Sequence, residues 1–328
     1  MIEKTLVFRS PGFDPYENIA IEKHLLETVD TGCCILYLWQ NKNTVVIGRN
    51  QNAWVECRTT LLEEEGGKLA RRLSGGGAVY HDLGNLNFTF LMSTEDYDLD
   101  RQLAVIQTAC AAAGIQAERS GRNDLLVCGH KFSGNAFYHS QGKAYHHGTL
   151  LVNADLNKLS RYLTPSKAKL EAKGVASVRS RVANLREFAP ALTCTVLEKH
   201  MTDAFAQVYG LVPEEITLRA AEKESIQGSA AQLQSWDWLY GSRLPFSFSC
   251  DAHFPWGGIS LQLQVQSGLI QAAQVYTDAM EWTLADRVTE ALTGCRFTLP
   301  DMQAAIRKHI SSKQAAADIC QMLAEQDI

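Results

Sequence analysis

The chain has 328 residues and a formal net charge of −5 at pH 7, with 46% hydrophobic and 20% charged residues. These proportions are ordinary for a globular protein, and the length suits two domains. Because there is no broad basic excess, nucleic acid is excluded as the expected main partner.

The first half of the chain is predicted to mix helices with short strands. Turn residues 40–43 lie between two β-rich runs, which predicts a hairpin of residues 34–38 and 44–48. The other elements expected in this half are a helix over 16–29, strands near 68–73, 78–81 and 86–92, a helix over 100–113 closed by Gly114, and alternating strands and turns over 123–152.

Helix signals follow in the middle of the chain. Asp155 is expected to cap a short helix. Thr195 and Glu198 form a T-x-x-E capping box, which predicts a longer helix that runs to Tyr209 and closes at Gly210.

The pattern of polar and apolar residues changes after this helix. Residues 211–244 are polar and weakly periodic, and we interpret them as a connector. Residues 259–266 alternate apolar and polar side chains, which predicts a strand with one dry face, followed by a strand over 269–276 and two or three helices. The pattern is α+β, and we expect a first domain over 1–244 and an accessory domain over 245–328.

The cysteines and apolar runs indicate a cytoplasmic protein. The nine cysteines are irregularly spaced without a C-x-x-C pair, as expected for reduced thiols and not for disulfides or a zinc site. The apolar run near Met1 is too short for a signal peptide, and no uncharged apolar stretch approaches the ~18 residues of a spanning helix. We therefore expect neither secretion nor insertion into a membrane.

The densest unusual segment spans residues 71–85. It contains Ser-Gly-Gly-Gly at 74–77 between two predicted strands. Consecutive glycines allow a backbone to approach a ligand with its N–H groups pointing outward, and Arg72 supplies a planar donor fork for a carboxylate or phosphate. Taken alone, Ser-Gly-Gly-Gly is more often a flexible hairpin loop, but the whole string favours an anion-binding loop.

Lys131 is the candidate catalytic cation. It follows a Cys128-Gly129 turn and is expected to open a strand. A compact ammonium can lie between two anionic oxygens, as is needed when a carboxylate attacks ATP. Its alternative is an exposed lysine on a strand edge. Asn123 and Asp124 are by default a turn signal, but they could hold a ribose or a metal-bound phosphate.

Two further segments have a functional and a simpler interpretation. His146 and His147 are adjacent, but neighbours on a strand point to opposite faces and no third ligand has zinc spacing, so we expect a structural role beside the pocket. The basic run 173–185 contains a glycine and could close over an anionic nucleotide, although a solvated loop is the simpler interpretation. The chain lacks G-x-x-x-x-G-K-[ST], G-x-G-x-x-G and G-x-S-x-G motifs.

Four strings in this order resemble the lipoate-protein ligase A family: RRLSGGGAVYHDLGN, GRNDLLVCGHKFSGNA, HHGTLLVNADL and KGVASVRSRVANL. The resemblance is strong over about residues 5–190, with support at 14–22 and 45–52, and it is weaker in the C-terminal domain, where FPWGG at 254–258 fits. It implies a biotin-protein-ligase-like catalytic domain with a central mixed β-sheet flanked by helices, and a small α/β accessory domain.

The resemblance also implies an activity and a set of residues. It implies ATP with Mg²⁺, a lipoyl-AMP intermediate, and transfer to lipoyl domains of 2-oxoacid dehydrogenase E2 subunits or to the glycine-cleavage H protein. Lys131 matches the catalytic lysine that contacts the acyl carbonyl and the α-phosphate, and the backbone of Val79 would contact the adenine edge. The implied nucleotide-binding residues are Arg72, Gly75, Gly76, Gly77, Ala78, Val79, Tyr80, Asn123, Asp124 and Lys131, with Asp124 reaching Mg²⁺ through the phosphates.

The implied substrate-binding residues are Arg72, Ser74, His81, Asn87, Ser133, Gly134, His147, Gly148 and Thr149. The implied loop that closes over the adenylate contains Lys173, Gly174, Val175, Ser177, Val178, Arg179 and Arg181. One departure is His130, where relatives often place Lys or Arg.

Several alternatives remain open at this point. A lipoyl or octanoyl transferase with a carrier-bound donor would share the fold, but one that depends on a thioester needs a cysteine nucleophile, and Cys128 has no neighbouring base in the sequence. An amidotransferase that uses preformed lipoyl-AMP, a non-catalytic lipoate-binding module and a biotin ligase are the others. We expect a monomer, because no long exposed apolar stripe is evident.

Overall fold

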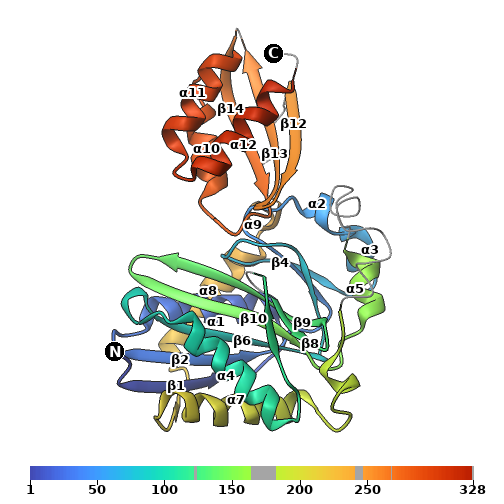
Figure 1. The fold of residues 1–328 in the computed structure, drawn as a ribbon, viewed down its shortest axis with the longest axis vertical. Coiled ribbons are helices and arrows are strands. Elements are labelled where there is room, and N and C mark those ends of the chain that lie inside the picture. Colours follow the sequence, from blue (N-terminus) through green and yellow to red (C-terminus); the bar gives the residue numbers. More distant parts are fainter. Residues whose placement is uncertain (122–123, 164–181, 241–246, 267, 327–328) are drawn as a thin grey trace.

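The computed structural model describes residues 1–121, 124–163, 182–240, 247–266 and 268–326 (Figure 1). Within these ranges, eight strands form a central mixed sheet. In spatial order they are β11 (Glu214–Glu215), β1 (Lys4–Arg9), β2 (Cys33–Trp39), β6 (Asn85–Ser93), β10 (Lys143–Leu151), β9 (His130–Ser140), β8 (Asp124–Val127) and β7 (Glu118–Ser120). β1 runs parallel to β11 and β2, and the other neighbours are antiparallel.

Helices cover both faces of this sheet, which explains why β2 buries all of its residues. On one face, Cys34, Leu36 and Leu38 belong to a core with α4 (Leu99–Ala112) and α7 (Cys194–Tyr209). On the other face, Ile35 and Tyr37 pack with α1 (Pro15–Thr28) and α8 (Ala220–Gln234). Successive side chains of a strand point to opposite faces, so one short apolar run serves two cores.

A second, three-stranded sheet lies beside the first. β3 (Thr44–Ile47) pairs parallel with β4 (Lys68–Arg71) and antiparallel with β5 (Val79–His81). The predicted hairpin of residues 34–38 and 44–48 is therefore wrong, since β2 and β3 belong to different sheets. The buried side chain of Asn41 explains the departure of the chain, because it bonds to Asn18 and His81 at the junction of the sheets. The helices near this sheet are α2 (Ala53–Glu56), α3 (Thr59–Glu64) and α5 (Leu156–Tyr162).

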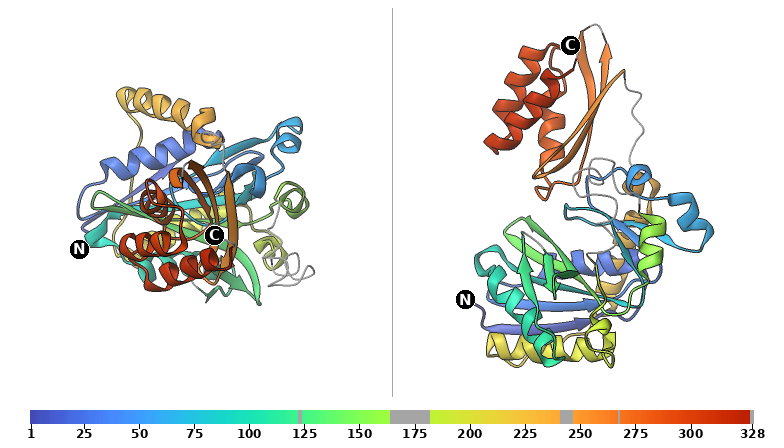
Figure 2. Two further views of the ribbon diagram at one scale, coloured as in Figure 1. Left: turned by 90° about the horizontal axis from the view of Figure 1, so that it is seen from above. Right: turned by 45° about the vertical axis from the view of Figure 1, so that its right-hand side comes forward.

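The C-terminal residues form a separate small domain with its own core. Its elements are β12 (Phe248–Phe254), β13 (Gly257–Gln266), β14 (Leu269–Thr277), α10 (Leu284–Leu292), α11 (Leu299–His309) and α12 (Lys313–Ala324). The predicted alternation is confirmed, since Ile259, Leu261 and Leu263 are buried between the sheet and the helices. The predicted domain boundary between 244 and 245 lies outside the described residues. Figure 2 shows this domain standing at one end of the larger body.

The helix ends test the local predictions. Asp155 caps α5 and Gly210 closes α7 in the left-handed conformation, as predicted. The capping box at Thr195 is wrong, because Thr193 caps α7 and accepts the backbone N–H of Val196. The expected connector over 211–244 instead contains α8 and α9 (Trp236–Tyr240). In the described part of the chain, none of the helices is both long and apolar enough to span a membrane.

Candidate functional site

A cavity of about 150 Å³ lies where the two sheets meet α1. Its outer part is lined by the loop of residues 74–77, here called the glycine loop, and by the start of β9. The lining residues are Ile19, Glu22, Trp39, Val46, Arg72, Gly76, Gly77, Ala78, Val79, His81, Asn87, Lys131, Gly134, Asn135, Ala136, His147, Gly148 and Thr149. Lys131 therefore lies at the same cavity as the glycine loop, as the sequence predicts.

The β8–β9 hairpin sets the direction of Lys131. Cys128 and Gly129 both have positive φ, of 48° and 78°, as in the tight turns that suit hairpins. The pairing then shifts by one residue, since Leu126 faces Lys131 but Asp124 faces Gly134. This bulge turns the Lys131 side chain to the face that carries Asp124 and Gly134.

Lys131 and Asp124 form an ion pair at the mouth of the cavity. The Nζ atom lies 2.7 Å from Oδ1 of Asp124, and the two side chains are 36% and 34% exposed. The backbone of Lys131 also bonds to the segment that follows the predicted closing loop, because its carbonyl accepts the N–H of Ala183 at 3.0 Å. The ammonium thus pairs with Asp124 while it stays in contact with solvent, and the backbone of Lys131 is fixed separately by Ala183.

Arg72 holds the glycine loop in shape. Its guanidinium donates to the carbonyls of Gly75 and Gly77, each at 2.8 Å, to the carbonyl of Val46 at 3.2 Å, and to Oγ of Ser74 at 3.1 Å. Burial lowers the pKa of Arg72 to about 10. The donor fork, which the sequence predicts for a carboxylate or phosphate, is largely used by the loop itself.

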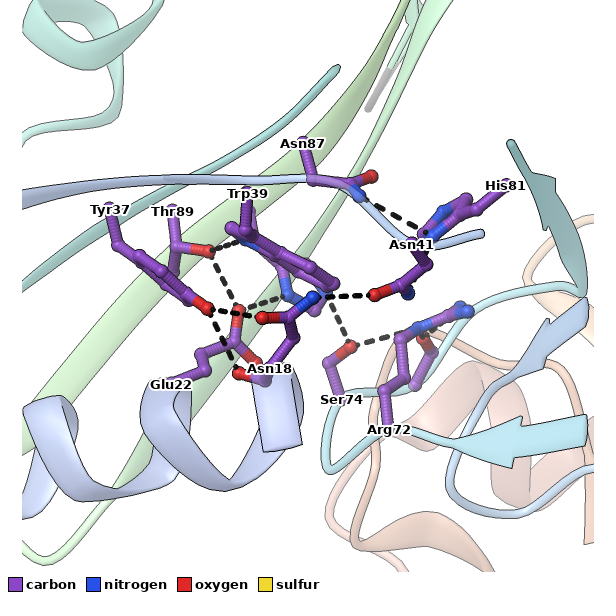
Figure 3. Close-up of polar contacts among 12 residues, drawn as sticks. Asn18, Glu22, Tyr37, Trp39, Asn41, Arg72, Ser74, His81, Asn87 and Thr89 are labelled. Atoms are coloured by element: carbon purple, nitrogen blue, oxygen red, sulfur yellow. Dashed lines mark hydrogen bonds and ion pairs between the residues drawn. The ribbon is translucent and has the colours of Figure 1, made fainter. Parts of the chain in front are cut away.

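A chain of hydrogen bonds runs along the inner wall of the cavity (Figure 3). Ser74 Oγ lies 2.9 Å from Nε2 of His147, and Nδ1 of His147 lies 2.8 Å from Oε1 of Glu22. The same oxygen accepts the hydroxyl of Thr89 at 2.7 Å, which in turn accepts the indole N–H of Trp39 at 3.0 Å. Glu22 is fully buried, and its Oε2 atom has no partner among the described residues.

His81 presents a hydrogen-bond donor to the cavity. Its Nδ1 atom accepts the side-chain amides of Asn41 at 3.1 Å and Asn87 at 3.5 Å. Burial, together with smaller effects of Arg72 and His147, lowers the pKa of His81 to about 3, so the imidazole is neutral at pH 7. The proton is then on Nε2, which is buried and has no partner among the described residues.

Some predicted residues lie elsewhere. Tyr80 packs against Tyr162 and donates to Asn43 at 3.0 Å, so its side chain points away from the cavity. Ser74 lies behind the glycine loop, Gly75 contacts the small domain, and Ser133 is buried outside the cavity lining. The predicted residues Asn123, Lys173, Gly174, Val175, Ser177, Val178, Arg179 and Arg181 lie outside the described residues.

The adjacent histidines point to opposite faces of β10, as predicted. His147 lines the cavity, whereas His146 lies 3.0 Å from Gln102 and 2.8 Å from Asn135 on the other face of the strand. No group of three His, Cys, Asp or Glu side chains that could hold a metal ion occurs in the described ranges.

The small domain touches the back of the glycine loop. The amide of Gly76 donates to the carbonyl of Ala279 at 3.4 Å, and a Cβ atom on Gly75 would lie only 2.6 Å from that oxygen. Nearby, the guanidinium of Arg49 lies 5.2 Å from the ring of Trp282 and 5.8 Å from that of Trp238. The domain contact therefore requires a glycine at position 75, and the positive φ of 88° favours one at position 76, whereas a Cβ atom at Gly77 would have nothing within 4 Å.

Sequence reasoning missed the residues that face the cavity from α1 and from the inner strands. These are Ile19, Glu22, Trp39, Val46, Asn135 and Ala136. A signal existed for Glu22, because it lies three residues after Ile19 and four before Leu26 on the buried face of α1. A carboxylate on an apolar helix stripe is a candidate for a buried polar role.

Comparisons with known proteins agree with this architecture. The family model of the lipoyl protein ligase A/B catalytic domain matches residues 14–206, and that of the bacterial lipoate protein ligase C-terminus matches residues 244–323. The structure of P. falciparum LipL1 in complex with lipoate is 29% identical with a TM-score of 0.85, covering 98% of this chain and 100% of that one.

Two further structures resemble the larger domain. A bi-partite lipoate protein ligase from T. acidophilum, described with its E2 lipoyl domain, is 26% identical with a TM-score of 0.65, covering 76% of this chain and 100% of that one. A lipoate-protein ligase A bound with ATP is 24% identical with a TM-score of 0.64, covering 74% of this chain and 99% of that one, and shows the same fold.

Proposed function

Since the chain belongs to the lipoate-protein ligase family, we propose that it is an ATP-dependent ligase that converts lipoate to lipoyl-AMP and then transfers the lipoyl group to a lysine of an acceptor protein. The family resemblance drawn from the sequence motifs is confirmed by the two family models. The ATP-dependent chemistry and the acceptor are our proposal.

The observation that carries this proposal is the position of Lys131 at the mouth of a cavity whose inner part has apolar as well as polar walls. Ile19, Trp39 and Val46 offer apolar walls for an acyl chain at the buried end. Lys131 lies at the solvent end, where a carboxylate and a nucleotide can both reach it. A ligase of this kind needs a binding cavity with one buried end and one end open to solvent, because its acyl substrate is apolar and ATP is polar.

In the first step, an oxygen of the lipoate carboxylate attacks the α-phosphorus of ATP, and pyrophosphate leaves. The two anionic reactants repel each other, and the ammonium of Lys131 lowers this repulsion by lying between them. In the second step, the acceptor lysine amine attacks the acyl carbonyl, and AMP leaves.

Mg²⁺ would enter with ATP as its counterion. Mg²⁺ in such sites is held by one or two carboxylates together with substrate phosphates. Asp124 is the carboxylate beside Lys131, and it is one-third exposed. The residues present fit a metal that arrives on the nucleotide.

The acceptors that we propose are lipoyl domains of E2 subunits and the glycine-cleavage H protein. Support for the first comes from the T. acidophilum ligase, which was described together with an E2 lipoyl domain. We also propose a monomeric, cytoplasmic enzyme, and each of the nine cysteines is free, as a reducing compartment requires.

A thioester-forming transferase is the main alternative, and the cavity disfavours it. No cysteine is among the described residues that line the cavity. Cys128 lies on the exposed turn of the β8–β9 hairpin, and the imidazole of neighbouring His130 bonds to its backbone carbonyl instead of its thiol. A nucleophilic thiol needs a base that accepts its proton, and the hydrogen bond of His130 in the described structure goes to the Cys128 carbonyl.

Two measurements test the proposal. Purified enzyme with ATP, Mg²⁺ and lipoate should release pyrophosphate, and a purified lipoyl domain added to this mixture should gain the mass of one lipoyl group. Lys131→Ala should lower both by orders of magnitude, whereas Lys143→Ala, which removes a half-buried lysine of β10 that donates to the carbonyl of Glu27, should keep both. Acyl transfer without pyrophosphate release would show that the protein is a transferase.

A further inference from the structure

Asp124 is predicted from the sequence as a nucleotide-side residue, but its contact in the structure is the catalytic lysine. We propose that Asp124 is a positioning residue: its carboxylate holds the ammonium of Lys131 at the mouth of the cavity in the free enzyme and releases it to the anionic substrates when they bind. The inference rests on the proposed ligase function and assigns a distinct task within it.

The geometry of the hairpin brings the two side chains together. Asp124 begins β8 and faces Gly134 across the ladder, while Lys131 lies three residues before Gly134 on β9. In a regular strand, residues three apart would point to opposite faces. The bulge between Leu125 and Leu126 cancels this, so Lys131 shares the face of Asp124 and its Nζ lies 2.7 Å from Oδ1.

Gly134 completes the position. A Cβ atom there would lie 3.2 Å from Nζ and 3.3 Å from Cε of Lys131, so the lysine lies directly against the backbone of β9. The carboxylate on one strand and the bare glycine on the next define a single place for the ammonium. Without Asp124, a flexible four-carbon side chain would have no partner among the described residues to keep it there.

The exposure of Lys131 and Asp124 explains how their ion pair can be replaced by contacts between Lys131 and the substrates. Both side chains are about one-third exposed, and ion pairs in such surroundings are weak because water and salt screen them. A substrate carboxylate and an α-phosphate together present more negative charge than one aspartate. Because Oδ1 of Asp124 is buried and loses its contact when the ammonium moves, the exchange depends on this stronger attraction of the substrates.

Contact with the ammonium does not prevent Asp124 from meeting a metal that arrives with the nucleotide. One of its oxygens contacts the ammonium in the free enzyme, and a role on Mg²⁺ would begin only when ATP binds. A role limited to Mg²⁺ makes a different prediction, because its loss is corrected by more Mg²⁺.

The test is Asp124→Asn, which keeps the shape of the side chain and removes its charge. We expect the kcat of pyrophosphate release to fall about 10-fold or more, while the KM values for lipoate and ATP change by less than about 3-fold. Asp124→Glu should retain more activity than Asp124→Asn. The matched control is Asp100→Asn, which breaks an exposed ion pair with Arg119 at 2.9 Å and should leave kcat unchanged.

A double-mutant cycle separates positioning from direct binding. On a Lys131→Ala background, Asp124→Asn should cause no further loss of adenylate formation in single-turnover assays, because its effect acts through Lys131. The proposal is overturned if the losses of the two single variants multiply in the double variant. It is also overturned if excess Mg²⁺ restores the activity of Asp124→Asn. If the wild-type protein releases no pyrophosphate, the ligase function itself fails, which is a separate result.

A measurement without turnover keeps the inference testable if a variant is inactive for other reasons. The rate at which an amine-selective acylating reagent modifies Lys131, followed by mass spectrometry, should rise several-fold in Asp124→Asn, because the amine has lost its ion-pair partner. Equal rates in the wild type and in folded Asp124→Asn would show that the carboxylate does not hold the lysine.

Discussion

The α-carbon of Gly134 lies directly beneath the side chain of Lys131, so close that a Cβ atom would come within 3.2 Å of the ammonium nitrogen. This contact is tighter than most real Cβ contacts, and the end of a lysine is free to move. A methyl group at position 134 would therefore shift the ammonium and leave the fold intact.

We predict that Gly134→Ala lowers the kcat of lipoyl-AMP formation by about 10- to 100-fold, because displacing a catalytic group by about 1 Å has effects of this size. Pyrophosphate release measures the effect, and the thermal midpoint should stay near that of the wild type. Gly228→Ala is the control, since Gly228 lies in α8 and a Cβ atom added there would have nothing within 4 Å. Wild-type kcat in Gly134→Ala would show that the ammonium does not work from this place.

Arg72→Lys should disrupt the glycine loop although the charge is kept. The carbonyls of Gly75 and Gly77 accept from the guanidinium fork, and a single ammonium cannot reach the same set of acceptors. We expect the free energy of unfolding to fall by about 2–4 kcal/mol, as when buried acceptors lose their donors, and the KM for ATP to rise. Urea unfolding and steady-state kinetics check this. Arg119→Lys, at an exposed ion pair, should change neither quantity.

Stability should depend on pH through His146. Burial, together with smaller effects of His147 and Arg119, lowers the pKa of His146 to about 3 from the ordinary histidine value of 6.5. The unfolded chain therefore binds more protons than the folded protein between these values. As the pH falls from 6.5 toward 3, this imidazole reduces the free energy of unfolding by about 1.4 kcal/mol per pH unit.

The measurement is urea unfolding at several pH values in this window. His146→Gln should reduce the slope of the free energy of unfolding against pH by the contribution of one histidine. The slope is compared, and not the free energy at one pH, because the substitution also removes packing against Phe88 and Phe137. The buried His81 should keep a similar dependence in both proteins. An unchanged slope in His146→Gln contradicts the prediction.

Trp282→Ala should loosen the contact between the small domain and the glycine loop. Trp282 packs on Arg49 and on Tyr138, whose ring lies 5.2 Å away, and a contact of this kind contributes about 1 kcal/mol. We expect the amide of Gly76 to exchange with solvent roughly 5-fold faster, because it donates to Ala279 across this contact. Hydrogen exchange measures it. Trp236→Ala, which removes a half-exposed ring of α9, is the control and should leave the exchange unchanged.

Sequence patterns predicted local structure well where one face of an element is buried. The alternation at 259–266 predicted β13 because half of its residues face one core. The helix α8 was missed because only Ile226 and Leu233 are buried along it, which leaves too weak a periodicity. The β2–β3 hairpin was wrong because a polar turn does not specify which sheet the next strand joins.

The site was predicted where it consists of contiguous motifs and missed where it depends on distant partners. Except for Asn87, the lining residues from Arg72 to Thr149 lie in the strings that resemble the family. Glu22 was missed because its hydrogen bonds to Thr89 and His147 join residues far apart in the sequence. The bonds of Arg72 to Gly75 and Gly77 are local, and they were missed because a guanidinium before a glycine-rich loop suits an anion equally well.

The function of Lys131 depends on the register of the β8–β9 hairpin, in which β9 contains one extra residue. Phe132 is the unpaired residue, and its ring is fully buried in the main core. Deleting it would leave a regular ladder in which Lys131 still faces Leu126, so the cation would keep the face of Asp124, but the main core would lose a fully buried ring. A change in register that brought Lys131 opposite Leu125 or Val127, which both lie in the main core, would instead turn its amine toward the apolar interior even if every side chain were kept.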